Sequence, residues 1–126
     1  MGTMDESLYC KVFVDTPRDA NSILASIASF VGGATQGLTV VSETLEVDVR
    51  RNEDFDPQKQ GCENAFLFYR YYLDVVPTQY LAESRRSQYI AVVASILSML
   101  KDSGCRVVAA CDFEDELSVI PGEPEG

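Results

Sequence analysis

The chain has 126 residues, of which 46% are hydrophobic and 24% are charged, a composition typical of a single globular domain. Acidic residues outnumber basic ones by 20 to 10, which gives a formal net charge of −10, and there is no histidine. A field of this sign repels phosphate backbones and attracts basic proteins. The most apolar window is too short to span a bilayer. We therefore expect no nucleic-acid partner and no membrane association.

The cysteines give no indication of a metal site. Cys10, Cys62, Cys105 and Cys111 lack the close paired spacing of zinc ligands, and no histidine is present to complete a set. Three of the four lie in apolar surroundings. We interpret them as reduced core thiols, which implies a cytoplasmic location, with a disulfide framework as the less favoured alternative. No metal or cofactor is expected.

The first half of the chain predicts a strand, a helix and a second strand. Apolar and other residues alternate from Leu8 to Val14, which is typical of a strand. A helix is expected next, with Thr16 as its N-cap and Gly32 as its stop. Leu38 to Arg50 is predicted to form one long strand, bent or bulged near Ser42.

The second half repeats this order after a loop. Arg51 to Asn64 is rich in turn-forming residues, and the following stretch NAFLFYRYYLDVVP is predicted to be a strand that ends at Pro77. A helix is expected from Tyr80 to Lys101, and a short strand from Cys105 to Cys111.

The order βαββαβ predicts an α+β ferredoxin-like sandwich. This arrangement has a four-stranded antiparallel sheet, in the order 4-1-3-2, with two helices on one face. Residues 1–7 are expected to be a disordered N-terminus or a vector-derived remnant, residues 8–117 a single domain, and residues 118–126 a flexible acidic tail.

Aromatic residues occupy both registers of the strand before Pro77, so one set must face away from the helices. The sequence leaves open which set does so, the one with Phe66 and Tyr72 or the one with Tyr69 and Tyr71. An exposed patch of this composition is typical of a protein-binding surface, for a second copy or a different protein. The alternative is that the C-terminal tail covers it. The expected aromatic contacts are Tyr9, Phe13, Tyr69 and Tyr71.

Two acidic clusters flank this expected patch. A divalent-cation site is disfavoured because the glycine and the regular spacing of an EF-hand loop are missing. Acid–base catalysis is disfavoured because no nucleophile or histidine accompanies the carboxylates. We expect instead that they steer a basic partner, which makes the chain a non-catalytic binding module. The charged contacts expected are Asp54, Asp56, Asp112, Glu114 and Asp115.

The segments YYLDVVP and VVAACDFEDEL resemble those of small acidic immunity-type proteins encoded beside bacterial polymorphic toxins. The resemblance implies an immunity or inhibitor protein that neutralises a basic toxin through a tight complex in the cytoplasm, without catalytic residues. The alternative is a homodimeric, small-molecule-binding regulatory domain. It would resemble the ACT domains, which share βαββαβ, although the glycine of their first loop is missing here.

Overall fold

The computed structural model describes residues 8–59, 65–78, 83–111, 113 and 117. These residues form an α+β structure, in agreement with the predicted class. The helices are α1 (Ala20–Val31) and α2 (Glu83–Asp102). The strands are β1 (Cys10–Asp15), β2 (Ala34–Gln36), β3 (Thr39–Val41), β4 (Leu45–Arg51), β5 (Tyr71–Pro77) and β6 (Arg106–Cys111). Two short 3-10 turns are η2 (Pro57–Lys59) and η3 (Ala65–Phe68).

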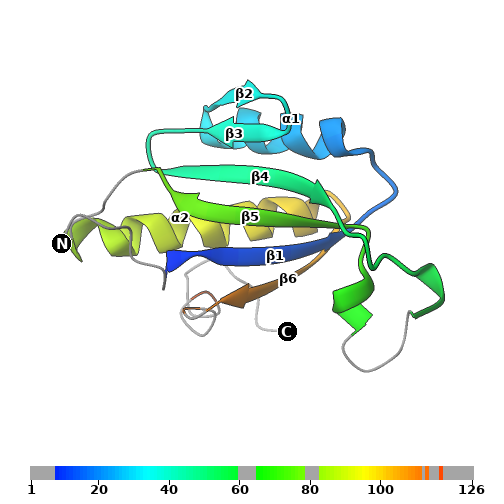
Figure 1. Ribbon diagram of the computed structural model, residues 1–126. Helices are drawn as coiled ribbons and strands as arrows, with labels where there is room; N and C mark the ends of the chain where they lie inside the picture. The colour runs from blue at the N-terminus through cyan, green and yellow to red at the C-terminus, as the bar shows by residue number, and fades with distance from the viewer. Residues whose placement is uncertain (1–7, 60–64, 79–82, 112, 114–116, 118–126) are drawn as a thin grey trace.

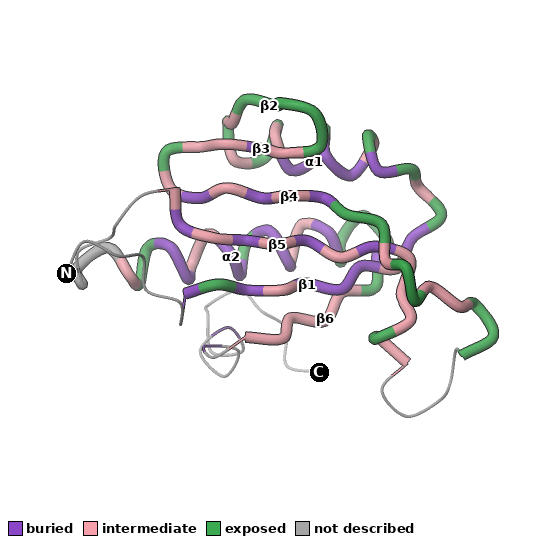
Figure 2. The backbone as a smooth tube through the Cα atoms, in the orientation of Figure 1, coloured by how far each residue is buried: buried purple, intermediate pink, exposed green. Residues whose placement is uncertain are grey.

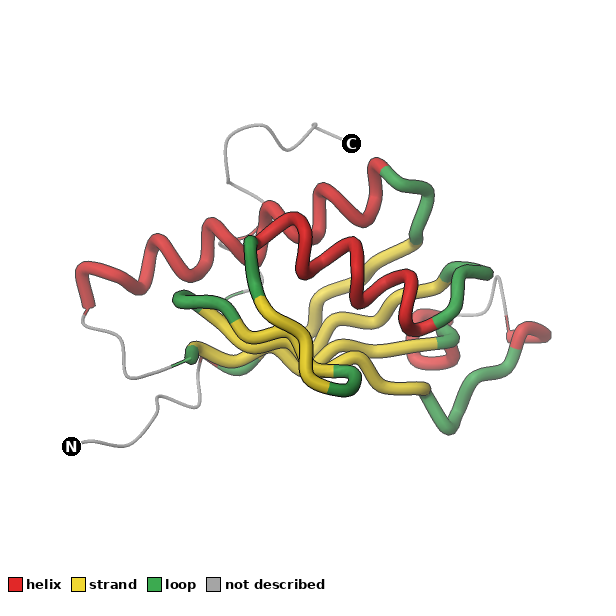
Figure 3. The backbone as a smooth tube through the Cα atoms, turned by 90° about the horizontal axis from the view of Figure 1, so that it is seen from above, coloured by secondary structure: helices red, strands yellow, loops and turns green. Residues whose placement is uncertain are grey.

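The strands form one antiparallel sheet in the order β2-β3-β4-β5-β1-β6 (Figure 1). Both helices lie on the same face of this sheet, as the view from above shows (Figure 3). The predicted number of four strands is wrong, because the sheet has six. The strands predicted at the two ends of the chain and before Pro77 correspond to β1, β6 and β5.

The extra strands arise where one long strand was expected. The chain reverses after Ser42, whose hydroxyl donates to the Leu45 carbonyl at 3.0 Å and accepts from the Leu45 amide at 3.1 Å. A serine side chain that bonds its neighbours' backbone in this way stabilises a turn in place of a continuous strand. β2 adds a further antiparallel neighbour to β3, through a turn at Gly37 with a φ of 59°.

The ends of α1 are set by local capping. Asp19, and not Thr16, is the N-cap, and its side chain accepts from the Ser22 amide at 2.8 Å. Thr16 is instead buried before the helix starts. The predicted stop at Gly32 is confirmed, because this residue adopts the left-handed conformation with a φ of 68°.

The core lies between the sheet and the two helices (Figure 2). β5 shows why, since Tyr71, Leu73 and Val75 are buried while Tyr72 and Asp74, which alternate with them, are only half-buried. Helix α1 contributes Ile23 and Ile27, which are fully buried one turn apart. Neither helix in the described ranges has both the length and the apolar composition that a membrane crossing requires.

A projecting arm extends from one end of the sheet (Figure 1); it comprises the described residues 52–59 and 65–70. Asn52 holds its two halves together, because its side-chain amide donates to the carbonyls of Leu67 at 2.9 Å and Tyr69 at 2.7 Å. The Asn52 backbone amide also donates to the Arg70 carbonyl at 2.9 Å. The aromatic stretch before Tyr71 is therefore part of the arm, and the strand predicted there is shorter than expected.

Candidate functional site

The face of the sheet opposite the helices is the candidate site, and we call it the open face. Antiparallel register places residues of neighbouring strands side by side across it. One row runs across four strands and consists of Thr39, Asp48, Asp74 and Lys11. The adjacent row consists of Arg50, Tyr72 and Phe13.

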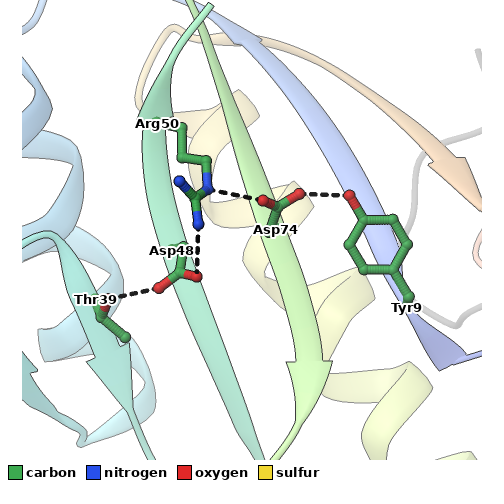
Figure 4. Close-up of polar contacts among 5 residues, drawn as sticks. All are labelled: Tyr9, Thr39, Asp48, Arg50 and Asp74. Atoms are coloured by element: carbon green, nitrogen blue, oxygen red, sulfur yellow. Dashed lines mark hydrogen bonds and ion pairs between the residues drawn. The ribbon is translucent and has the colours of Figure 1, made fainter. Parts of the chain in front are cut away.

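Two carboxylates stand directly opposite each other in the first row, where like charges repel. Arg50 compensates them, because its Nε lies 2.9 Å from Asp74 Oδ2 and its Nη2 lies 3.5 Å from Asp48 Oδ2 (Figure 4). Thr39 donates its hydroxyl to the other oxygen of Asp48, and Tyr9 donates its hydroxyl to the other oxygen of Asp74. Five polar side chains therefore form one continuous chain of contacts across the open face.

The electrostatics keep this network in its bonded state. Burial and the hydrogen bond to Asp74 raise the pKa of Tyr9 well above its usual value, so its hydroxyl remains a donor at neutral pH. The hydrogen bond and the charge of Asp74 likewise raise the pKa of Arg50. Both residues on either side of Asp74 thus keep their protons throughout the physiological range.

An aromatic group lies beside the network. The Lys11 ammonium is 4.3 Å from the ring centroid of Tyr72 and 5.2 Å from that of Phe13, within the range of cation–π contacts. Phe66 of the arm packs its ring edge-on against Phe13, at 5.3 Å between centroids. Phe13 points to the open face as predicted, but only 6% of it is exposed. Its predicted role as a surface contact therefore needs correction: Phe66 covers it.

The other three predicted aromatic contacts differ in how exposed they are and in which part of the structure they lie. Tyr9 is 39% exposed on the open face and is available to a partner. Tyr71 is buried on the helix side, where its hydroxyl donates to the Arg18 carbonyl at 2.8 Å, so the prediction that it is a surface contact is wrong. Tyr69 is half-buried in the arm, outside the sheet.

The two predicted acidic contacts that the structure describes, Asp54 and Asp56, lie in the arm and not on the open face. Asp54 is exposed in the arm. Asp56 is half-buried there, and its carboxylate accepts from the Gln58 amide at 2.9 Å at the start of η2, which is a capping role. Asp112, Glu114 and Asp115 lie outside the described residues.

Among the residues of the site that were not predicted as contacts are Arg50, Tyr72 as the outward ring of its strand, and Asp74. The signal for Asp74 was its position in YYLDVVP, where a carboxylate alternates with buried apolar residues. Such a charge inside a central strand must face the uncovered side of the sheet. Its pairing with Arg50 required the register between β4 and β5.

A separate cleft of about 350 Å³ opens where β1 ends and the arm begins. The guanidinium of Arg70, which lines this cleft, lies over the ring of Phe55, 4.5 Å from the ring centroid. The residues that line the cleft are Asp15, Thr16, Pro17, Phe55, Pro57, Arg70, Gly104 and Arg106. In the part of the chain that the structure describes, no group of three or more acidic, cysteine or histidine side chains could hold a metal ion.

Fold and site together define an α+β protein with one covered and one open sheet face. Comparisons with protein-family models, with curated proteins and with solved structures found no match to this chain.

Proposed function

We propose that this protein is a non-catalytic binding module whose open face binds a basic protein. The observation that carries the proposal is the ordered chain of side chains from Tyr9 through Asp74 to Arg50, on a sheet face that no described helix covers. Tyrosine and arginine are the residue types that concentrate binding energy in interfaces. Side chains already fixed by each other lose little entropy when a partner arrives, which favours tight binding.

Charge supports a basic partner. The chain carries a formal net charge of −10, and of its charged groups the open face bears the carboxylates of Glu46, Asp48 and Asp74 and the cations of Lys11 and Arg50. A field of this sign speeds the approach of a positively charged protein, and the effect weakens as salt screens it. Association faster at low salt is therefore expected.

Within this class we propose an immunity or inhibitor protein that acts in the cytoplasm on a basic toxin. The segment YYLDVVP, on which the resemblance to immunity-type proteins rests, is β5. This strand supplies both Tyr72 and Asp74 to the open face. The resemblance and the candidate binding surface thus rest on the same residues.

We also propose that the sheet is an extended ferredoxin-like arrangement. Four of its strands follow the order β4-β5-β1-β6, which is the expected order 4-1-3-2 read from the other edge. A helix on the same face follows each of the two central strands, α1 after β1 and α2 after β5, before the chain reaches the outer strands β4 and β6. The hairpin of β2 and β3 would then be an addition between α1 and β4.

Binding to a candidate basic toxin, measured by biolayer interferometry, tests the function. Tyr9→Ala should weaken the affinity about tenfold or more, since truncation of a central interface tyrosine typically costs over 1 kcal/mol. The matched control is Phe30→Ala, because Phe30 is similarly exposed, at 47%, but lies on α1. Loss of affinity in Phe30→Ala with none in Tyr9→Ala would contradict the proposal.

The cleft favours a second candidate function, a regulatory domain that binds a small anion. Arg70 and Arg106 against Asp15 give the lining a local excess of positive charge in an otherwise acidic chain. Small carboxylates and phosphates should then raise the melting temperature of the protein. Arg70→Gln should abolish that rise. The control Arg51→Gln, at an exposed position outside the lining, should show the same rise as the parent. If none of the small anions tested raised the melting temperature of the parent protein or of the control, this function would be rejected.

A further inference from the structure

Two cysteines face each other across neighbouring strands. The register of β1 and β6 pairs Cys10 with Cys111, at the beginning of one strand and the end of the other. Both are present as thiols in the structure. They lie about 100 positions apart in the sequence, which is most of the domain, so a bond between them would close a long loop.

The geometry of such a pair suits a disulfide. Directly opposed residues of antiparallel strands have their Cα atoms about 4.5 or 5.5 Å apart, depending on the hydrogen-bonding position. Disulfides require Cα separations of roughly 4.4–6.8 Å. Because opposed residues also point to the same face of the sheet, the two thiols extend in the same direction. The register therefore places the two cysteines at a separation that a disulfide can span.

A second observation concerns the side of the sheet on which the two cysteines lie. Tyr89 of α2 lies against this corner of the core, where its hydroxyl donates to the Leu8 carbonyl at 2.6 Å. Burial raises the pKa of Tyr89 most, and the proximity of Cys10 and Cys111 raises it further. Cys10 belongs to the same core and Cys111 packs against it, so both cysteines lie on the helix side of the sheet.

The two thiols differ in access. Cys10 is fully buried on the central strand β1, whereas Cys111 is half-buried on β6, the strand at the edge of the sheet. A reagent from solution therefore reaches Cys111 first. This difference assigns them separate roles in thiol–disulfide exchange, with Cys111 as the attacking thiol and Cys10 as the resolving one.

We propose that Cys10 and Cys111 form a reversible cross-strand disulfide by exchange with a low-molecular-weight disulfide such as oxidised glutathione. The Cys111 thiolate attacks one sulfur of glutathione disulfide, forms a mixed disulfide and releases one glutathione thiolate. The Cys10 thiolate then attacks Cys111 Sγ and releases the second glutathione. The two protons lost by the cysteines end on the two glutathione molecules, whose disulfide has been reduced as the protein dithiol is oxidised.

The bond would fix the edge strand β6 to the central strand β1. Loop closure over roughly 100 residues constrains the unfolded chain strongly, so the oxidised protein should melt on the order of 10 °C higher than the reduced protein. Because β6 also borders the open face, a fixed β6 would keep that side of the sheet in place under oxidising conditions.

The test uses the full chain with Cys62→Ser as the background, equilibrated in glutathione buffers from fully reduced to fully oxidised. Intact mass should show the loss of two hydrogen atoms, and peptide mapping should show Cys10 joined to Cys111. Cys111→Ser should prevent the bond. Cys105→Ser is the matched control, because Cys105 is buried at the opposite end of β6 and the bond should still form.

Three results would overturn the proposal. The first is that both thiols stay reduced in the most oxidising buffer. The second is a glutathione adduct that persists on Cys111 without closure onto Cys10. The third is a bond that includes Cys105. The melting temperature of the oxidised protein gives an independent readout, since a bond that strained the sheet would lower it instead of raising it.

Discussion

Arg50 of β4 and Asp74 of β5 are joined on the diagonal, with Nε 2.9 Å from Oδ2, although the residue directly opposite Asp74 is Asp48. The guanidinium thus lies between two carboxylates that would otherwise face each other without compensation. Repulsion between them is the expected consequence of its removal.

Arg50→Gln should lower the melting temperature slightly, and the loss should shrink as salt is added because salt screens the repulsion between Asp48 and Asp74. Thermal melts at two salt concentrations check this. The double variant Asp48→Asn/Arg50→Gln, which removes one of the two facing charges, should recover the loss. Equal melting temperatures for Arg50→Gln and the parent at low salt would contradict the compensating role.

The free energy of unfolding should fall more steeply at alkaline pH than it would if Tyr9 and Tyr89 had the usual pKa of a tyrosine. Burial raises the pKa of both Tyr9 and Tyr89 above the usual 10.0. Above that pH the unfolded chain releases protons that the folded chain keeps, so the free energy of unfolding falls as pH rises. Tyrosinate absorbance should show a group that ionises only together with unfolding. Titration of all six tyrosines below the unfolding transition would contradict this.

Tyr89→Phe should lower the free energy of unfolding by about 1–2 kcal/mol, because the buried Leu8 carbonyl loses its donor. Urea denaturation measures the change. Tyr72→Phe is the matched control, since Tyr72 is half-exposed on the open face and should change stability little. Equal effects of the two substitutions would show that the buried hydrogen bond is not the cause.

Gly33→Ala should destabilise the fold by about 1–3 kcal/mol. A Cβ at this position would lie 2.8 Å from the Val41 carbonyl oxygen and 2.9 Å from Val40 Cγ1, so β3 would have to move away. Thr35→Ala, in the exposed strand β2, is the control and should be nearly neutral. An unchanged denaturation midpoint for Gly33→Ala would place β3 further from α1 than described.

Asn52→Ala should loosen the projecting arm without unfolding the domain, because both side-chain hydrogen bonds to the arm's second half are lost. Limited proteolysis should cut the arm faster, while the global transition changes by about 1–2 kcal/mol at most. Gln58→Ala, at an exposed position of η2, is the control. Identical cleavage rates in Asn52→Ala and the control would contradict the anchoring role.

Much of the fold could be predicted because local patterns determined it. Alternation located β1, a short apolar run located β6, helical spacing located α2, and Gly32 marked the end of α1 through its left-handed conformation. The reversal after Ser42 could not be predicted in this way, since a hydroxyl supplies the turn where no glycine or proline marks one. The start of β5 was misplaced because Asn52, distant in sequence, holds the preceding aromatic residues in the arm.

The candidate site, too, could be predicted only in part from the sequence. Alternation alone placed Tyr9 and Phe13 on the open face, as found. The burial of Phe13 depends on Phe66, which reaches it from the arm. The pairing of Arg50 with Asp74 depends on the register of two strands, and one strand's sequence does not contain that information.

The most direct test of the proposed binding face is site-specific photo-crosslinking in cells, with a photoreactive amino acid in place of Tyr9 or of Phe30. The two positions are similarly exposed, but only Tyr9 lies on the open face. The account predicts that position 9 crosslinks one discrete basic protein and that position 30 does not. Crosslinking to the same protein from position 30 alone, or to a second copy of this chain from position 9, would contradict it.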